Sequence, residues 1–369
     1  MINIVGVGDI MPGGILAGVK HGYVSEDILA LLSSADIRVG TLETAIGNEP
    51  TFYEEKMSRK ADVIYALDKD LSKLSHLNIN IVSLANNHFF DLGPEGAKHT
   101  IELLDHLNIE HIGAGRNIEE ASKAVIKLIN GESVAFIAFC DWRDETVGWC
   151  PFATETTPGV NPMFDDHVKA EIQKYKSICD YVVVMPHWGK EHTYVTTDSV
   201  VKMAKLMINA GADLILGSHP HRVQPVVNYN KASIAYSMGN FLFPNRLIAP
   251  PRSTYYSEEP IDIHKLPSTD HYPFVNELTF KKWKPLATIG MIVCSQLAPK
   301  RTLSTYKLTQ MGEDGYISLC DNSKVANTLC FWGNVIKYTP YGLIYFVLRA
   351  MKSIIFRSKR LSSKILHLK

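Results

Sequence analysis

The stretch ADLILGSHPH, residues 212–221, carries the pattern from which we predict the fold. An apolar run comes first, Gly217 follows it, and the histidines His219 and His221 come directly afterwards. A short run without polar alternation is typical of a strand that is buried on both faces. Two imidazoles just beyond such a strand are either ordinary loop residues or ligands of a metal ion, and this stretch alone does not decide between the two.

Six further stretches in residues 1–245 repeat this pattern of a short apolar run that ends in a polar or glycine-containing loop. Helical patterns lie between several of them, at 93–109 and at 198–211, where Asp198 is the expected N-cap and Gly211 the expected end. The alternation of strand and helix predicts an α/β fold with much parallel sheet. The six stretches are residues 2–8, 36–43, 79–88, 133–139, 181–189 and 233–241.

The pattern breaks over residues 246–285, where prolines cluster with Tyr, Ser and His and little periodicity remains. We expect an irregular excursion or a lid-like loop there. Strand patterns return at 287–297 and 315–320. We therefore predict one domain over residues 1–325, followed by a basic C-terminal tail over residues 326–369.

Charge is distributed unevenly along the chain. Of 369 residues, 46% are hydrophobic, which is enough to fill a sizeable core. The formal net charge is zero, but nine of the 38 basic residues follow Asp321, the last acidic residue, so that the chain up to Asp321 carries −9 and the remainder +9.

The cysteines and the N-terminus bear on the compartment of the protein. The six cysteines include no C-x-x-C pair, which favours ordinary thiols in a reducing compartment. The N-terminal sequence MINIVGVGDIM lacks the features of a signal peptide. We therefore expect a cytoplasmic protein.

Side chains with metal-binding chemistry follow five of the predicted strands. Ligands of open α/β sheets bind beyond the carboxyl ends of the strands, so we expect these side chains at one rim. They offer oxygen and nitrogen donors without a thiolate, which suits one or two divalent ions such as Mn, Fe or Zn. The candidates are Asp9, Glu43, Asn87, His187, His219 and His221.

Each candidate taken alone also has an ordinary structural explanation. Asp9 could cap a helix, and Glu43 could be a solvated loop carboxylate. Asn87 could hydrogen-bond to a turn, and His187 could be a partly buried imidazole with a protein partner. Their shared position at the strand ends weakens these explanations. The metal hypothesis requires that side chains far apart in the sequence converge within coordination distance of a shared ion.

The order of the motifs resembles the CapA family, the bacterial poly-γ-glutamate capsule synthesis group within the calcineurin-like metallophosphatase superfamily. The resemblance covers about residues 2–245, and it implies a four-layer α/β/β/α sandwich of the metallophosphatase type. Its most specific stretches are residues 83–93 and 217–225. The motifs are Gly-Asp-x-Met at 8–11, Leu-Glu at 42–43, Ala-Asn-Asn-His at 85–88, His-Trp-Gly at 187–189, Gly-x-His-Pro-His at 217–221 and Gly-Asn-Phe at 239–241.

The resemblance implies a role for each candidate. Asp9 would bind a first metal ion, and Glu43 would bridge it to a second. The other ligands would divide between the ions, Asn87 and His187 at the second, and His219 and His221 one at each. One departure from the general superfamily is Met11, which replaces the histidine of an Asp-x-His motif and is a poor ligand for a hard ion. The CapA-like group shares this methionine, and the number of ions stays open.

Residues around the ligands are candidates for catalysis and substrate binding. The resemblance implies that His88 is the catalytic residue, which protonates the leaving group or clamps a phosphate. Asn240 would orient a ligand or the substrate. Arg222, Lys190 and Lys56 are either anchors for an anionic substrate or plain surface cations.

These inferences predict a metal-dependent hydrolase of phosphoester or γ-glutamyl-type bonds that acts in capsule synthesis. One alternative is a non-catalytic component that assembles or handles the capsule polymer and keeps a structural metal site. Another is a centre that acts on an amide or a cell-wall peptide. We expect an anionic polymer or a phosphoester as substrate, and no nucleic acid partner.

Residues 338–369 form the most basic part of the chain. The longest apolar stretch without charge, residues 341–348, is far shorter than the roughly 20 residues that span a bilayer. A basic amphipathic helix is typical of segments that bind an anionic membrane surface or a partner, here a capsule-synthesis protein. The protein would then be peripheral at the inner face of the membrane. The alternative is a helix docked on the acidic body of the same molecule. The apolar face would contain Leu343, Val347, Ala350, Met351 and Ile354.

Overall fold

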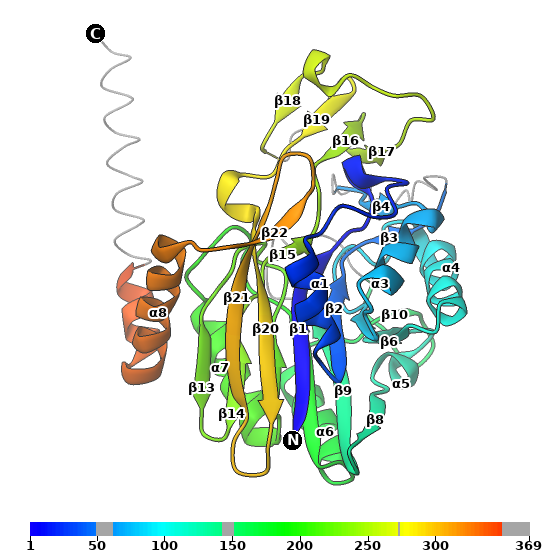
Figure 1. Cartoon of the computed structure of the whole chain (residues 1–369). Helices are drawn as coiled ribbons and strands as arrows, with labels where there is room; N and C mark the ends of the chain where they lie inside the picture. The colour runs from blue at the N-terminus through cyan, green and yellow to red at the C-terminus, as the bar shows by residue number, and fades with distance from the viewer. Residues whose placement is uncertain (49–61, 142–150, 272–273, 349–369) are drawn as a thin grey trace, which may run out of the picture.

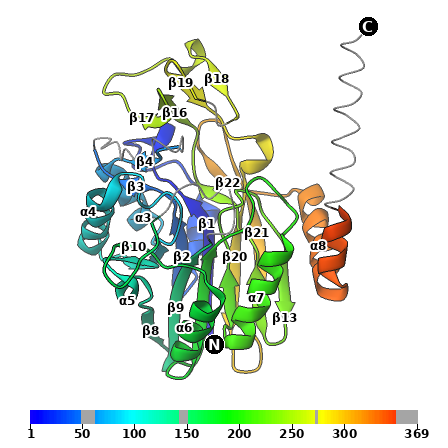
Figure 2. The same ribbon diagram turned by 180° about the vertical axis from the view of Figure 1, so that it is seen from behind.

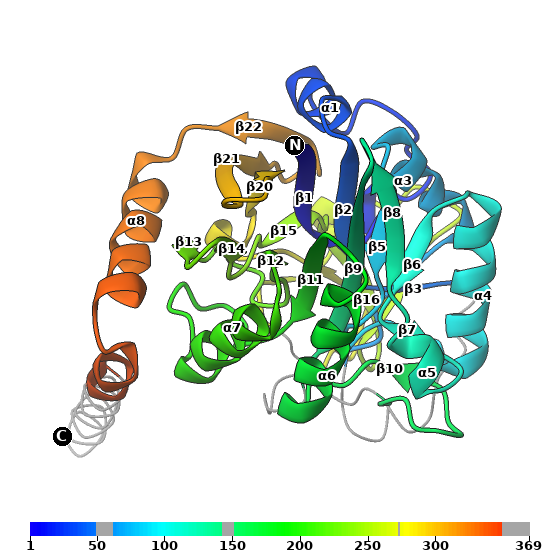
Figure 3. The same cartoon turned by 90° about the horizontal axis from the view of Figure 1, so that it is seen from below.

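Two β-sheets lie face to face at the centre of the protein, and helices cover the outer face of each (Figures 1 and 3). This computed structural model describes residues 1–48, 62–141, 151–271 and 274–348. One apolar core joins the facing sides of the two sheets, with Val7 from one sheet and Phe136 and Leu216 from the other. The predicted four-layer α/β/β/α sandwich is confirmed.

The larger sheet has eight strands, and its centre is parallel. Strand β1 (Ile2–Ile10) pairs in parallel with β2 (Ile37–Leu42), and β5 (Ile81–Ser83) and β6 (Glu110–Ile112) continue in the same direction. On the other side of β1 the pairing is antiparallel, through β20 (Ile289–Leu297), β21 (Leu303–Met311) and β22 (Ile317–Cys320). Of these strands, β6 and β21 were not predicted from the sequence.

The smaller sheet has six strands in the order β13–β14–β12–β11–β9–β8. Strands β9, β11, β12 and β14 are mutually parallel, whereas β8 and β13 are antiparallel edges. The bounds are β8 (Val125–Ile129), β9 (Glu132–Cys140), β11 (Tyr181–His187), β12 (Leu214–Leu216), β13 (Val226–Tyr229) and β14 (Ala232–Ala235).

The stretch 233–241, predicted as one strand, is divided between the two sheets. Its first part is in β14 of the smaller sheet, and its end is in β15 (Asn240–Leu242), which pairs with β1 of the larger sheet. The chain crosses between the sheets at Gly239, whose φ of +65° is unfavourable for other residues. The apolar pattern is continuous across the crossing because both strands are buried.

Two helices cover the smaller sheet, α6 (Asp165–Lys176) and α7 (Asp198–Ala210) (Figure 2). The end of α7 at Gly211 is confirmed, with φ of +124°. Its predicted N-cap is wrong by one residue, because the side chain of Thr197 accepts the hydrogen bond from the backbone N–H of Val200.

The larger sheet is covered by α1 (Glu26–Ser33), α3 (Ser72–His76) and α4 (Gly93–His106), whose residues Ile28, Leu74 and Leu104 enter the same core as β1. The remaining short elements join or flank these layers. They are α5 (Ile118–Ala121), the strand pairs β3 (Ala45–Ile46) with β4 (Tyr65–Ala66) and β7 (Ala114–Gly115) with β10 (Gly159–Val160), and the 3₁₀ helices η1 (Gly14–Leu16), η2 (Asp68–Leu71), η3 (Ile263–Lys265) and η4 (Pro285–Ala287).

The region 246–285 is more ordered than the expected irregular excursion. It contains a four-stranded sheet of its own, seen above the sandwich in Figure 1. Its short strands carry little periodicity, which explains why the sequence did not reveal them. The strands are β16 (Arg246–Ala249), β17 (Ser253–Tyr255), β18 (Ser268–Thr269) and β19 (Thr279–Lys281).

Helix α8 (Ser323–Tyr338) flanks the smaller sheet beside β13 (Figure 3). The division predicted between residues 325 and 326 lies inside this helix and stays a prediction. Among the described residues, no helix has the length and apolar character needed to cross a membrane.

Candidate metal centre

The six predicted metal ligands come together where strands from both sheets end. Asp9 lies at the end of β1, Glu43 directly after β2, and Asn87 after β5. From the smaller sheet, His187 ends β11, and His219 and His221 follow β12. None of the six side chains is more than 5% exposed. The larger sheet thus supplies the oxygen donors and the smaller sheet the imidazoles.

One group of ligand atoms contains Asp9, Glu43 and His221, with all three atoms within 4.8 Å of one another. The Nδ1 atom of His221 lies 3.6 Å from Oδ2 of Asp9, and its Nε2 atom lies 3.6 Å from Oε1 of Glu43. The three residues reach this place from three different strand ends.

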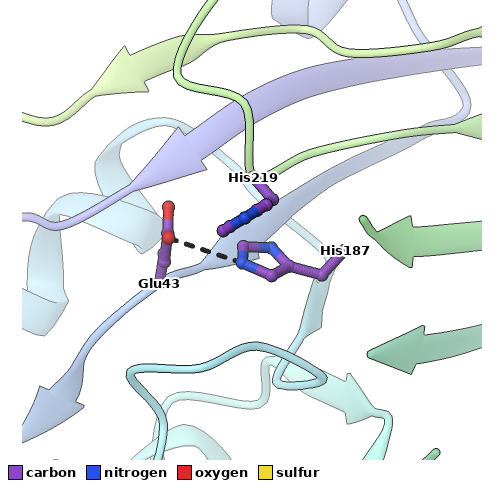
Figure 4. A group of neighbouring side chains, drawn as sticks. All are labelled: Glu43, His187 and His219. Atoms are coloured by element: carbon purple, nitrogen blue, oxygen red, sulfur yellow. Dashed lines mark ion pairs between the residues drawn. The ribbon is translucent and has the colours of Figure 1, made fainter. Parts of the chain in front are cut away.

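A second group contains Glu43, His187 and His219, again within 4.8 Å (Figure 4). Oε1 of Glu43 lies 3.5 Å from Nε2 of His187, and the rings of His187 and His219 are 4.6 Å apart. Asn87 joins this group, because its Oδ1 atom lies 2.8 Å from the same Nε2 of His187. Glu43 is therefore common to both groups.

The backbone around the histidines is strained. His219 and His221 have φ of +93° and +50°, in the left-handed region that non-glycine residues rarely adopt. Such residues cost about 1–3 kcal/mol each and cluster at functional sites. Gly8 permits a close approach nearby, since a Cβ atom there would lie 1.8 Å from the carbonyl oxygen of Gly239. The backbone conformation that brings these strand ends together therefore lowers the stability of the fold locally.

Two polar residues orient the imidazoles. The side-chain amide of Asn240 donates to the carbonyl oxygen of Ala287 at 3.0 Å, which turns its Oδ1 atom toward Nδ1 of His221, 2.9 Å away. His221 therefore donates through Nδ1 and presents Nε2 toward Glu43. In the same way, Nδ1 of His187 lies 3.0 Å from the hydroxyl of Ser218. Asn240 thus contacts a candidate ligand, and its contact with a substrate stays a prediction.

Burial shifts the pKa of four groups in the centre toward their neutral forms. It raises the pKa of Asp9 and of Glu43, and the negative charge of Asp9 raises the pKa of Glu43 further. Burial also lowers the pKa of His187 and of His221, and neighbouring histidines add to that effect. Neutral imidazoles are metal ligands, and a nearby cation would allow both carboxyl groups to ionise.

The donor set fits one or two divalent ions. Oδ1 of Asp9 and both carboxylate oxygens of Glu43 are buried and receive no hydrogen bond from a described residue. Buried carboxylate oxygens are costly unless a donor or a cation compensates them. The 2.8 Å between His187 Nε2 and Asn87 Oδ1 also suits two ligand atoms of one ion, because metal–ligand distances of about 2.0–2.2 Å bring neighbouring ligands to roughly 3 Å.

Met11 does not take part in this donor set. Its side chain is buried, and its sulfur accepts a hydrogen bond from the backbone N–H of Gly13 at 3.3 Å. The group of Asp9, Glu43 and His221 still offers three ligand atoms without it. Three protein ligands leave a position for water or substrate, as in catalytic metal sites.

His88 lies beside the centre and is held by a carboxylate that the sequence analysis did not single out. Its Nδ1 atom is 2.8 Å from Oδ2 of Asp91, which is fully buried and also accepts from the backbone N–H of Ile64 at 2.6 Å. The charge of His88 contributes to the lowered pKa of His187 and of His221. The signal for Asp91 was present, since it follows His88 by three residues in the same motif.

Cationic groups gather on the side of the centre near His221. Arg222 is 6% exposed, and its guanidinium lies 5.6 Å from the ring of Tyr194. The ring of His192, which the sequence analysis missed, lies 6.0 Å from that of His221. Burial lowers the pKa of His192 to about 4, and the charges of Arg222, Lys284 and Lys281 contribute.

Of the other two predicted anchors, the structure describes only Lys190. Lys190 is exposed, and no contact between described residues joins its amine to the centre. Lys56 lies outside the described residues. A further residue that the sequence did not reveal is Trp283, which follows β19 and whose ring lies 4.9 Å from that of His221. The region 246–285 therefore contributes an aromatic wall to the centre.

Residues 3–245 match the family model of the bacterial capsule synthesis protein PGA_cap. The chain belongs to this family. The PGA biosynthesis protein CapA of Bacillus subtilis is 30% identical over 242 residues, which cover 64% of this chain and 62% of the relative. The capsule biosynthesis protein CapA of Bacillus anthracis is 32% identical over 249 residues, which cover 64% and 58%. The chain thus spans about three fifths of the length of these PGA_cap relatives.

Among solved structures, the 5'-nucleotidase of Candida albicans overlaps with 91% of this chain and 58% of its own, at 9% identity and a TM-score of 0.41. A similarity this low adds nothing to what the sheets, the centre and the family membership establish.

Proposed function

We propose that this member of the PGA_cap family is a metal-dependent hydrolase of phosphoester or γ-glutamyl-type bonds. It would act in the synthesis of poly-γ-glutamate or a related surface polymer. The observation that carries the proposal is the position of Glu43, whose carboxylate belongs to two groups of buried ligand atoms. The names of its CapA relatives support the link to a capsule polymer.

Each residue of the centre has a distinct task in this proposal. Asp9, Glu43 and His221 would hold one ion, and Glu43 with Asn87, His187 and His219 would hold a second. Ions bound there supply Lewis-acid activation of a water molecule and of the bond to be cleaved. The carboxylates of Asp9 and Glu43 would offset the charge of one divalent ion, or half of the charge of two.

His88 would transfer a proton to the leaving group. Its Nδ1 atom is engaged by Asp91 at 2.8 Å, which fixes the orientation of the ring. Proton transfer would therefore use Nε2. General acid catalysis of this kind contributes about 10²–10⁴ in rate.

An anionic substrate agrees with the charges around the centre. Arg222 follows the ligand His221 directly, and the charges of Lys281 and Lys284 reach the adjacent His192. A cationic side of a buried site attracts carboxylates or phosphates. Both a γ-glutamyl polymer and a phosphoester meet this requirement.

The test combines metal content with turnover. Purified protein is stripped with a chelator, reloaded with Mn²⁺ or Zn²⁺, and assayed on a generic phosphodiester and on a γ-glutamyl polymer, with released phosphate or amine as the readout. The His219→Ala variant should lose metal. The His88→Ala variant should keep its metal and lose turnover by about 10²-fold or more.

The control is His264→Ala, which replaces an exposed histidine in η3 and should change neither quantity. Bound metal without turnover of either substrate would refute the hydrolase and favour a polymer-handling protein with a structural metal.

A further inference from the structure

We propose that the outer surface of the two C-terminal helices is a docking face for an anionic lipid bilayer. The helices are α8 and the helical residues 341–348 that follow it. The outer face is defined by five exposed apolar side chains on them, Phe331, Tyr338, Leu343, Phe346 and Val347. The proposal is independent of the chemistry at the metal centre.

Helix α8 has two apolar sides, of which only one is used for folding. Its inner side buries Val325, Leu329 and Ile336, and the helix contacts β13. Phe331 and Tyr338 are seven residues apart, so they lie on one side of the helix, and they are 59% and 71% exposed. Burial against the body of the protein therefore does not explain these two aromatic side chains.

The next helix repeats this arrangement. Tyr341 is 4% exposed and anchors the helix, since its hydroxyl donates to the carbonyl oxygen of Thr196. Leu343, Phe346 and Val347 follow the helical spacing of one face and are 64%, 70% and 47% exposed. Leu343 and Val347 belong to the apolar face predicted from the sequence, and both are turned away from the core. The other residues of that predicted face, Ala350, Met351 and Ile354, lie outside the described residues.

Charge identifies the occupant as an anionic surface. Every charged residue beyond Asp321 is basic. Lys324 and Lys337 are exposed on α8, and residues 349–369 add seven Lys or Arg. Lys324 lies in the first turn of α8, where a cation opposes the helix dipole, so its charge does not serve the helix itself. Exposed aromatic and aliphatic side chains combined with lysines are the composition of helices that lie in a membrane interface.

Such a face is peripheral to the bilayer. None of the described helices is suited to span it. α8 lies at the side of the sandwich (Figures 1 and 2). The sheet of β16–β19 lies on a different side of the molecule, above the sandwich in these views. A bilayer on the outer face would therefore contact α8 and residues 341–348 and leave the smaller sheet covered by α6 and α7.

The experiment is vesicle co-sedimentation of the full chain with phosphatidylcholine vesicles, with and without phosphatidylglycerol. Wild type should bind the phosphatidylglycerol vesicles, and about 1 M salt, which shortens the Debye length to about 3 Å, should weaken the binding. The double variant Phe331→Ser with Phe346→Ser should bind about tenfold less tightly, because less apolar area enters the interface. The matched control is Leu128→Ser, an apolar residue on β8 that is 76% exposed, and it should bind like wild type.

A second pair of substitutions tests the charge without touching the apolar side chains. The double variant Lys324→Glu with Lys337→Glu should weaken binding to vesicles that contain phosphatidylglycerol. It should leave binding to pure phosphatidylcholine vesicles unchanged. Unchanged thermal midpoints and metal content would show that all variants are folded. The proposal is overturned if wild type stays in the supernatant with anionic vesicles, or if Leu128→Ser weakens binding as much as the outer-face variant. It is also overturned if the outer-face variant only converts a dimer to a monomer, since the occupant is then a second copy of the chain.

Discussion

The Glu43→Gln substitution tests the shared ligand most directly. Gln has the shape of Glu but carries no charge, and Oε1 of Glu43 lies 3.5 Å and 3.6 Å from the imidazoles of His187 and His221. One substitution therefore removes the negative charge of a ligand that is common to both groups. Asp9→Asn, by contrast, affects a single group.

The expected effect has two parts of opposite sign. Without metal, the variant should be at least as stable as wild type at pH 7, because burial raises the pKa of Glu43 and makes its ionised form costly in the folded state. With metal at about 1,000 times the wild-type Kd, wild type gains about 4.1 kcal/mol. A metal affinity about 100-fold weaker reduces this gain to about 1.4 kcal/mol, so the metal-dependent rise in Tm should shrink by roughly 3–4 °C.

The assay is thermal unfolding with chelator and with saturating Mn²⁺, combined with metal analysis of the purified protein. Glu43→Gln should hold the least metal, and Asp9→Asn should retain an ion in the group of His187 and His219. Glu102→Gln is the control, because Glu102 is an exposed carboxylate on α4 whose side chain is 57% accessible. If Glu43→Gln binds as much metal as wild type and shows the same rise in Tm, Glu43 is not a shared ligand and the proposed centre is wrong.

Three further substitutions test the surroundings of the centre. Asp91→Asn should lower kcat about tenfold or more with metal content unchanged, because His88 loses its carboxylate partner; an unchanged kcat would separate Asp91 from proton transfer. Asn240→Ala should weaken metal binding by about 10–100-fold, since the Nδ1 atom of His221 loses its acceptor, and equal affinity by calorimetry would argue against this orienting role. Burial lowers the pKa of Lys281 from 10.5 to about 7, so the stability of wild type should rise between those pH values, where only the unfolded state keeps the proton. Lys281→Met should therefore raise Tm at pH 6 by more than at pH 10, and the same gain at both values would contradict a depressed pKa.

The layers of the fold were predictable because their signal is local. The stretches 2–8 and 181–189 are apolar on both faces, and this reveals a strand between two layers without any knowledge of its neighbours. The same pattern failed at 233–241, where one apolar run serves two sheets, and at β16–β19, where the strands are too short to show a period. The sheet that a strand joins, and the formation of very short strands, depend on contacts with distant parts of the chain. The residues of a single stretch do not specify these contacts.

For the candidate site, the sequence revealed the strand-end ligands but not the side chains that pack around them. Strand ends place side chains at a common rim, so Asp9 and His187 could be grouped from the order of the chain alone. The contacts of Trp283 and His192 with His221 could not be foreseen, because they arise where distant loops fold over the rim. Asp91 is an intermediate case, since it lies in the motif of His88 while its function as a hydrogen-bond partner depends on the turn between them.

The origin of the ligands has a mechanical consequence. Asp9 and Glu43 follow strands of the larger sheet, whereas His187, His219 and His221 belong to the smaller sheet. The chain also crosses between the two sheets nearby, at Gly239. A cation bound by these side chains would therefore link the two sheets to each other. Without the cation, the two sheets would separate more easily at the end where the chain crosses at Gly239. Amide protons of β1 and β12 would then exchange faster there than at the opposite end of the strands.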